Sequence, residues 1–149
     1  MRYYLDFEGT CFDTEAFFAY VRERGSDDAF EPGELSRFLY PDAATFLREK
    51  ENAVTIITSA DRETQEPKTK SALYGIPRMS VMYTGGARKG EFLAPHTHLH
   101  KDALLVDDST AELEALQKEC PELVLYEMRR CGGVGDGRWP VVRSLLELP

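Results

Sequence analysis

The chain has 149 residues, of which 42% are hydrophobic and 30% charged, and such a chain is most simply one globular domain, neither fibrous nor disordered. Its net charge of −8, from 26 acidic and 18 basic residues, disfavours nucleic-acid binding, because that function needs a basic face for phosphate contacts. The same acidity is compatible with a divalent-metal site, because clustered carboxylates attract hard cations.

The first third of the chain alternates apolar runs with turn signals. In order, the sequence predicts a strand over 2–6, a helix over 14–24, an acidic loop over 26–33, a short helix over 34–39 and a helix over 43–51. Gly25 is a typical helix stop, and Pro41 ends the short helix. Asp42 is placed to cap the helix that follows it.

The remaining elements follow the same alternation. In order, the sequence predicts a strand over 53–57, a helix over 61–71, a strand over 79–83, a helix or turn after Lys89, a strand over 103–106, a helix over 110–119, a strand over 122–126 and a terminal helix over 140–147. The run AVTII at 53–57 is continuous and β-branched, which is typical of a strand covered on both faces. Ser109 or Thr110 is expected to cap the helix at 110–119.

Strands that alternate with helices indicate crossover connections and a parallel sheet. We therefore predict a doubly wound, Rossmann-like α/β fold of about five strands, in a single domain over residues 1–149.

The cysteines and the N-terminus predict a cellular location. Cys11, Cys120 and Cys131 are an odd number without CxxC spacing, which favours reduced thiols in a cytoplasmic protein. The first residues do not have the pattern of a secretory signal, and no run approaches the ~20 apolar residues of a membrane span. We expect no membrane association.

Acidic and hydroxyl residues follow the predicted strands at the points where those strands end. Asp6 and Glu8 follow the first strand, and Asp107 and Asp108 follow the fourth. In a parallel α/β sheet, ligands bind outside the carboxyl ends of the strands. Oxygen ligands of this kind suit Mg²⁺ together with a phosphate group, and the basic Lys89 could neutralise phosphate oxygens.

These segments resemble the haloacid dehalogenase (HAD) superfamily of phosphohydrolases and phosphotransferases. LDFEGT resembles its first motif, normally DxDGT, and ITS at 57–59 resembles the second. Lys89 in ARKGEF resembles the lysine of the third motif, and LLVDDS resembles the acidic fourth motif. The resemblance covers roughly residues 2–126 and implies a HAD-like fold and a Mg²⁺ cofactor.

The resemblance also implies roles for individual residues. Asp6 would be the nucleophile that becomes an aspartyl-phosphate, and Glu8 would be the general acid and base. The catalytic set would comprise Asp6, Glu8, Thr58 and Lys89. Phosphate would bind at Gly9, Thr10, Thr58, Ser59 and Lys89, with Thr58 favoured over Ser59 as the catalytic hydroxyl. The metal would be held by Asp6, by Glu8 through its backbone carbonyl, and by Asp107 and Asp108.

Glu8 departs from the family pattern, which has Asp at this position. The extra methylene moves the carboxyl group by about one C–C bond, and a misplacement of ~1 Å can cost ~10²-fold in rate. The leading hypothesis is a Mg²⁺-dependent phosphatase, a phosphoric monoester hydrolase. The alternative is a weakly active or inactive module that binds metal and phosphate or serves regulation.

Residues 14–40 are too few for a full cap domain and predict a minimal helical cap. Family members of this kind leave the site open or cover it with a partner subunit, so the substrate is a phosphorylated compound of unspecified identity and an oligomer is possible. A receiver-like phosphoacceptor domain ranks lower, because the predicted third strand ends in Tyr83-Thr84-Gly85 instead of an acceptor Asp.

Three further features have a structural explanation as well as a functional one. The histidines at 96, 98 and 100 could ligate a metal, but a solvated loop is the favoured interpretation. The glycine-rich segment 132–137 is expected to be a flexible connector, with a lesser possibility that it borders the substrate entrance. Cys11 is expected to be a packed small side chain, with a redox role as the minor alternative.

Overall fold

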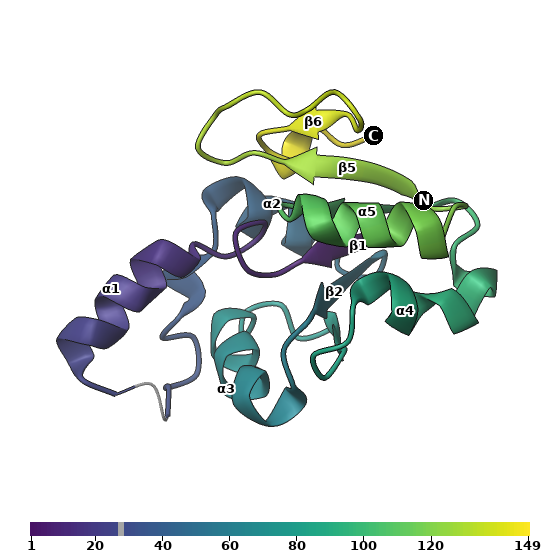
Figure 1. Ribbon diagram of the computed structural model, residues 1–149. Coiled ribbons are helices and arrows are strands. Elements are labelled where there is room, and N and C mark those ends of the chain that lie inside the picture. Colours follow the sequence, from purple (N-terminus) through teal and green to yellow (C-terminus); the bar gives the residue numbers. More distant parts are fainter. Residues whose placement is uncertain (27–28) are drawn as a thin grey trace.

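Six strands form one parallel sheet in the computed structural model, which describes residues 1–26 and 29–149 (Figure 1). The strand order is β3-β2-β1-β4-β5-β6, so β1 lies between the second and fourth strands of the chain. The strands are β1 (Arg2–Asp6), β2 (Val54–Thr58), β3 (Ser80–Tyr83), β4 (Ala103–Asp107), β5 (Val124–Met128) and β6 (Val141–Val142). The doubly wound α/β class is confirmed, with six strands where about five were predicted.

Helices connect the first five strands, and a loop leads from β5 to β6. The α-helices are α1 (Thr14–Arg24), α2 (Pro41–Lys50), α3 (Arg62–Ala72), α4 (Lys89–Leu93) and α5 (Thr110–Glu119). The described residues also form the 3₁₀ helices η1 (Ser36–Phe38), η2 (Ala94–Leu99) and η3 (Leu145–Glu147). The predicted short helix at 34–39 is thus a single 3₁₀ turn. The predicted acidic loop at 26–33 includes residues 27 and 28, which lie outside the described residues.

Alternate side chains of the central strands enter two separate hydrophobic cores. Tyr3 and Leu5 pack with Phe46 of α2 on one face, whereas Tyr4 packs with Leu113 of α5 on the other. Accordingly, α4 and α5 lie side by side over one face while α2 covers the opposite one (Figure 1). Since side chains alternate along a strand, Asp6 projects to the same side as Tyr4, toward α4 and α5.

The C-terminal segment corrects the prediction of a helix over 140–147. Val141 and Val142 instead pair with β5 as the edge strand β6, and only Leu145–Glu147 is helical. Glu127 donates its N–H to Pro140, and Arg129 donates its N–H to Val142. Two β-branched residues that complete a hydrogen-bonded ladder are more stable in a strand than in a short helix after proline.

Asp42 does not cap α2, which corrects a second prediction. The helix begins at Pro41, and Asp42 lies within its first turn. Its carboxylate accepts two hydrogen bonds from Arg130 Nη1 at 2.7 and 2.8 Å, and one from the backbone N–H of Leu145 at 2.7 Å. Arg130 Nε donates in turn to the carbonyl of Thr10 at 3.0 Å. Asp42 therefore connects the C-terminus to the loop after β1.

We expect Asp42→Asn to lower the free energy of unfolding at pH 7 by about 3 kcal/mol, because Arg130 loses a largely buried carboxylate. Burial acts to raise the pKa of Asp42, but hydrogen bonds from Arg130 and Leu145 outweigh it, so the pKa is lowered. The stabilisation is then fully present above the unfolded-state pKa of ~3.9 and is lost as pH falls through the lower folded-state value. Urea unfolding from pH 3 to 7 should show the two proteins converging in acid; a constant difference would contradict the assignment.

The histidine segment also differs from its prediction as a solvated loop. Residues 94–99 form the 3₁₀ helix η2, with His98 exposed and His96 half-buried. His100 is fully buried at the end of that helix. Short-range helical hydrogen bonds, including His100 N–H to the Thr97 carbonyl, give this segment its structure.

All three cysteines are free thiols, with Cys11 and Cys120 buried and Cys131 exposed. Burial raises the pKa of the Cys11 thiol far above its ordinary value, which agrees with a packed, unreactive side chain. In the described parts of the chain, every helix is too short or too polar to cross a lipid bilayer.

Candidate active site

The carboxyl ends of β1, β2 and β4 enclose a cavity of about 290 Å³. Leu5 pairs with Val106, so the next residues, Asp6 and Asp107, end neighbouring strands side by side. The lining residues are Asp6, Glu8, Thr58, Ser59, Ala60, Gln65, Lys89, Asp107, Asp108, Ser109 and Glu112. Seven of the nine residues predicted for the site therefore share one cavity; Gly9 and Thr10 do not line it.

Lys89 bridges the two buried carboxylates of this cavity. Its Nζ lies 2.5 Å from Asp6 Oδ1 and 2.5 Å from Asp107 Oδ2, and its side chain is 2% exposed. The backbone N–H of Lys89 donates to Glu112 Oε2 at 3.0 Å, which anchors the start of α4. Although burial acts to lower the pKa of Lys89, Asp6 and Asp107 outweigh it and raise that pKa, so the ammonium stays charged.

Asp6 retains one carboxylate oxygen, Oδ2, that is buried and without a hydrogen-bond partner. Burial and the neighbouring Asp107 raise the pKa of Asp6 well above its ordinary value, against the opposing effect of Lys89. An unpaired carboxylate oxygen in the interior is costly. Its presence at the cavity indicates a position prepared for an electrophile or a cation.

Asp6, Asp107 and Asp108 form a group whose carboxylate oxygens lie within 4.8 Å of one another. Burial, followed by Asp107, raises the pKa of Asp108 as well. Repulsion among three carboxylates is relieved by a cation, and an all-oxygen donor set suits Mg²⁺. The residues present thus fit a Mg²⁺ ion.

Comparison with known proteins adds evidence on the fold. No protein-family model and no curated sequence matches the chain. Among solved structures it is similar to YfnB of Bacillus subtilis, assigned to the HAD-hydrolases and bound to magnesium, with 14% identity, a TM-score of 0.69 and coverage of 99% of this chain and 96% of that one. The chain has the haloacid dehalogenase-like fold.

Two further solved structures are also similar to this chain. A HAD-superfamily hydrolase from Ehrlichia chaffeensis shares 12% identity at a TM-score of 0.61, over 98% of this chain and 92% of that one. The HAD domain of the effector protein Lem4 from Legionella pneumophila, an inactive mutant, shares 17% identity at a TM-score of 0.55, over 92% and 87%. The HAD-like fold that the sequence motifs implied is therefore confirmed.

Gly9 lies directly against the acidic group of this HAD-like site, although it does not line the cavity. Its φ is +77°, and a Cβ on it would lie 2.2 Å from Asp108 Oδ2. Its N–H donates to the carbonyl of Phe12 at 2.9 Å and so serves the turn after β1. Thr10 is fully buried, and its carbonyl accepts from Arg130. Both residues shape the loop that supports the site.

We expect Gly9→Ala to weaken Mg²⁺ binding by about 10-fold or more, because the added methyl group must displace Asp108. Gly132→Ala is a matched control, because Gly132 has a φ of +76° with nothing within 4 Å of an added Cβ. The two variants share the cost of a left-handed backbone, roughly 1–2 kcal/mol. Calorimetric Mg²⁺ titration should separate them, and equal affinities would refute the role of this close approach.

Glu8 reaches the same cavity, but its carboxylate already has three side-chain partners. Its Oε1 accepts from Lys68 Nζ at 2.5 Å and from Gln65 Nε2 at 2.8 Å, and its Oε2 accepts from the Thr14 hydroxyl. Burial acts to raise the pKa of Glu8, but Lys68, Thr14 and Gln65 outweigh it and the pKa is lowered. Glu8 is therefore held as a carboxylate, and its side chain stands apart from the acidic metal group.

Sequence reasoning did not identify Gln65, Lys68 or Thr14 as site residues. Gln65 and Lys68 lie three residues apart on α3, which places them on one face of the helix. That spacing, in the segment after the second motif, could have indicated that both side chains face the site. The contact between Lys68 and Glu8 could not be predicted from it, because the two residues are 60 positions apart.

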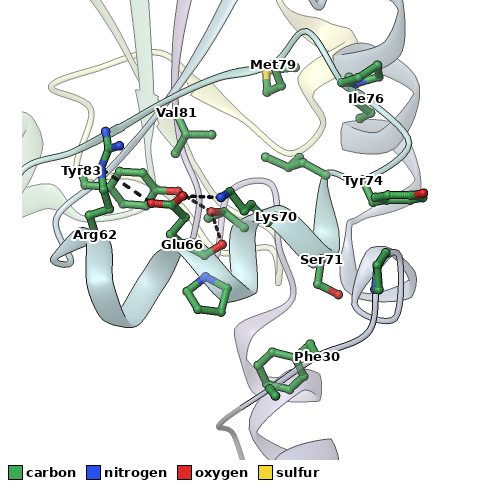
Figure 2. Close-up of a pocket in the computed structure, with 16 residues that line it drawn as sticks. Phe30, Arg62, Glu66, Lys70, Ser71, Tyr74, Ile76, Met79, Val81 and Tyr83 are labelled. Atoms are coloured by element: carbon green, nitrogen blue, oxygen red, sulfur yellow. Dashed lines mark hydrogen bonds and ion pairs between the residues drawn. The ribbon is translucent and has the colours of Figure 1, made fainter.

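A larger hollow of about 790 Å³ lies away from this chemistry, between α3, β3 and the loop around Phe30. Figure 2 shows Val81 and Tyr83 of β3 on one side, with Arg62, Glu66 and Lys70 of α3 joined by ion pairs. Its lining is mainly apolar, and it contains none of the carboxylates at the strand ends. The smaller cavity is therefore the candidate active site.

Proposed function

We propose that this protein is a Mg²⁺-dependent phosphohydrolase that forms an aspartyl-phosphate on Asp6. The free, buried Oδ2 of Asp6 supports this most strongly, because its sister oxygen is anchored by Lys89. A nucleophile that is fixed through one oxygen and keeps the other free of hydrogen bonds is oriented for attack on phosphorus.

The first step transfers the phosphoryl group to Asp6. Its Oδ2 bonds to phosphorus while the bond to the leaving oxygen breaks. Glu8 supplies the proton that this oxygen takes up after first binding a proton from solvent, because its lowered pKa leaves it a carboxylate at rest. Lys89 has three N–H donors, of which Asp6 and Asp107 use two, so one remains for a phosphoryl oxygen. The hydroxyl of Thr58, at the end of β2, is available for another.

The second step regenerates the protein. Glu8, now a carboxylate, takes a proton from water, whose oxygen attacks phosphorus and releases phosphate from Asp6. Bound Mg²⁺ would supply charge neutralisation for the carboxylates and the phosphoryl oxygens. Asp108, the backbone carbonyl of Glu8 and Oδ1 of Asp6 would hold it, while Lys89 fixes Asp107 in place.

The experiment is release of phosphate from an aryl phosphate, with Mg²⁺ and with a chelator, for wild type, Asp108→Asn and Glu8→Asp. We expect activity that requires Mg²⁺ and needs ~10-fold or more Mg²⁺ in Asp108→Asn, because a metal ligand loses its charge. An inactive wild type together with an active Glu8→Asp would overturn the phosphatase proposal.

The occupied carboxylate of Glu8 favours one second candidate, a module that binds Mg²⁺ and phosphate but turns over poorly. A general acid must present a proton to the leaving oxygen, and both oxygens of Glu8 already accept hydrogen bonds. Mg²⁺ and phosphate binding without release of product from any aryl phosphate would support this candidate over the enzyme.

The short segment 14–40 supports a phosphorylated substrate larger than a small metabolite. Its described residues, 14–26 and 29–40, contain one α-helix and one 3₁₀ turn, and α1 projects beside the sheet instead of forming a separate cap domain (Figure 1). A site without a domain over it can admit a bulky leaving group. Comparing turnover of phosphopeptides with that of free phosphoserine tests this part of the proposal.

A further inference from the structure

Three side chains from outside the four motifs converge on the carboxylate of Glu8. Lys68 and Gln65 approach from α3, and Thr14 approaches from the first residue of α1. Gln65 also donates to Thr58 Oγ1 at a longer 3.4 Å, so it contacts the turn after β1 through Glu8 and the last residue of β2. The second and first motifs are thereby joined through α3.

Lys68 occupies an unusual place for a lysine. Its side chain is 13% exposed, and its Nζ lies 4.6 Å from the ring centre of Phe17 and 5.6 Å from that of Phe12. An ammonium held against two aromatic faces loses most of its water and is stabilised by the rings and by a close carboxylate. Glu8 is that carboxylate, so the position of each side chain determines that of the other.

The length of the Glu8 side chain matters for these contacts. An aspartate at the same backbone position would draw the carboxyl group back by about one C–C bond, away from donors now at 2.5 and 2.8 Å. The three donors are therefore placed for glutamate.

We propose that Lys68, assisted by Gln65 and Thr14, is a positioning residue that holds the Glu8 carboxyl group at its working place in the site. The inference rests on the proposed function, because it assigns the position of the proposed acid and base. Lys68 acts through Glu8 and does not line the cavity itself. It follows that Glu8→Asp lowers turnover in this chain, although aspartate is the residue of the resembled motif.

The test compares Lys68→Met and Lys68→Arg in wild type and in a Glu8→Gln background, with Mg²⁺ saturating. We expect Lys68→Met to lower kcat by about 10- to 100-fold with KM changed less than about 2-fold, because a misplaced catalytic group costs rate more than binding. Lys68→Arg should recover part of kcat, and Lys68→Met should add nothing once Glu8 is Gln.

Lys70→Met is the matched control, because Lys70 lies on the same helix but pairs with Glu66, and its side chain is 74% exposed. Its kcat should equal that of wild type. An equal loss from Lys68→Met in the Glu8→Gln background would overturn the proposal, because Lys68 would then act on substrate or on folding. So would a rise in KM without a change in kcat.

A readout independent of turnover separates this proposal from the proposed function. The ¹⁵N resonance of the Lys68 ammonium group should be detectable by NMR at neutral pH, because ion pairing slows its proton exchange, and Glu8→Gln should remove it. If wild type shows no phosphatase activity although this signal is present, the proposed function fails, and the positioning role fails with it. If wild type is active but the Lys68 signal is unchanged in Glu8→Gln, the positioning role alone is overturned.

Discussion

Asp6→Asn is expected to abolish Mg²⁺-dependent phosphate release, with a loss of about 10⁴-fold or more, because a neutral amide is not a nucleophile toward phosphorus. Asn is nearly isosteric, so its Oδ1 can still accept from Lys89 and the cavity retains its shape. Phosphate release from an aryl phosphate, followed by intact-mass analysis after acid quench, measures both turnover and trapped aspartyl-phosphate.

The same variant should unfold at an equal or higher urea concentration than wild type. Burial and Asp107 raise the pKa of Asp6, which means that its charged form costs stability in the folded protein. Replacing it with a neutral side chain relieves repulsion of Asp107, while Lys89 keeps Asp107 as its partner. This pattern, lower activity with higher stability, is common at functional sites.

Asp136→Asn is the control, because this carboxylate is 42% exposed and pairs with Arg138 outside the cavity. It should retain full activity. Residual Mg²⁺-dependent turnover in Asp6→Asn within ~10-fold of wild type would exclude Asp6 as the nucleophile.

The second large effect is on stability. Lys89→Met is expected to lower the free energy of unfolding by about 3–5 kcal/mol at pH 7 without Mg²⁺, because it leaves two buried carboxylates unpaired. The deficit should shrink as pH falls. Asp6 and Asp107 have raised pKa values in the folded protein, so stability is gained as they take up protons on the way to acid.

Added Mg²⁺ should restore part of the stability of Lys89→Met, since an ion that binds only the folded state stabilises it by RT ln(1 + [L]/Kd). Urea unfolding at pH 5 and 7, with Mg²⁺ or a chelator, measures these dependences. Lys101→Met is the control, because Lys101 is exposed and should change stability little. A Lys89→Met protein as stable as wild type at pH 7 would contradict the bridging role.

Local sequence patterns were sufficient to predict the sheet and the neighbourhood of its acids. The β-branched run before Thr58 and the apolar run before Asp107 produced buried parallel strands, as predicted. Parallel strands bring their carboxyl ends to one edge, so Asp6 and Asp107 had to become neighbours once the strand order was right. Lys89 could be placed only by the motif resemblance, because nothing local distinguishes it from other lysines.

Tertiary contacts decided the rest, because they join residues far apart in sequence. The edge strand β6 forms because its residues pair with β5. Two consecutive valines are too short a pattern to predict that pairing from the sequence. Asp42 accepts hydrogen bonds from Arg130 and from Leu145 near the C-terminus instead of capping its own helix. Both cases replace a local preference with a stronger long-range hydrogen-bond partner.

The end of β1 shows most clearly which features the sequence determines and which depend on tertiary contacts. The sequence by itself determined that Asp6 and Glu8 lie at the end of a buried strand next to a tight turn. Only the tertiary structure decided what each acid contacts: Lys89 for Asp6, and Lys68, Gln65 and Thr14 for Glu8. The physical reason is that a carboxylate's charge state and orientation depend on its burial and nearest donors, and packing between distant segments sets both.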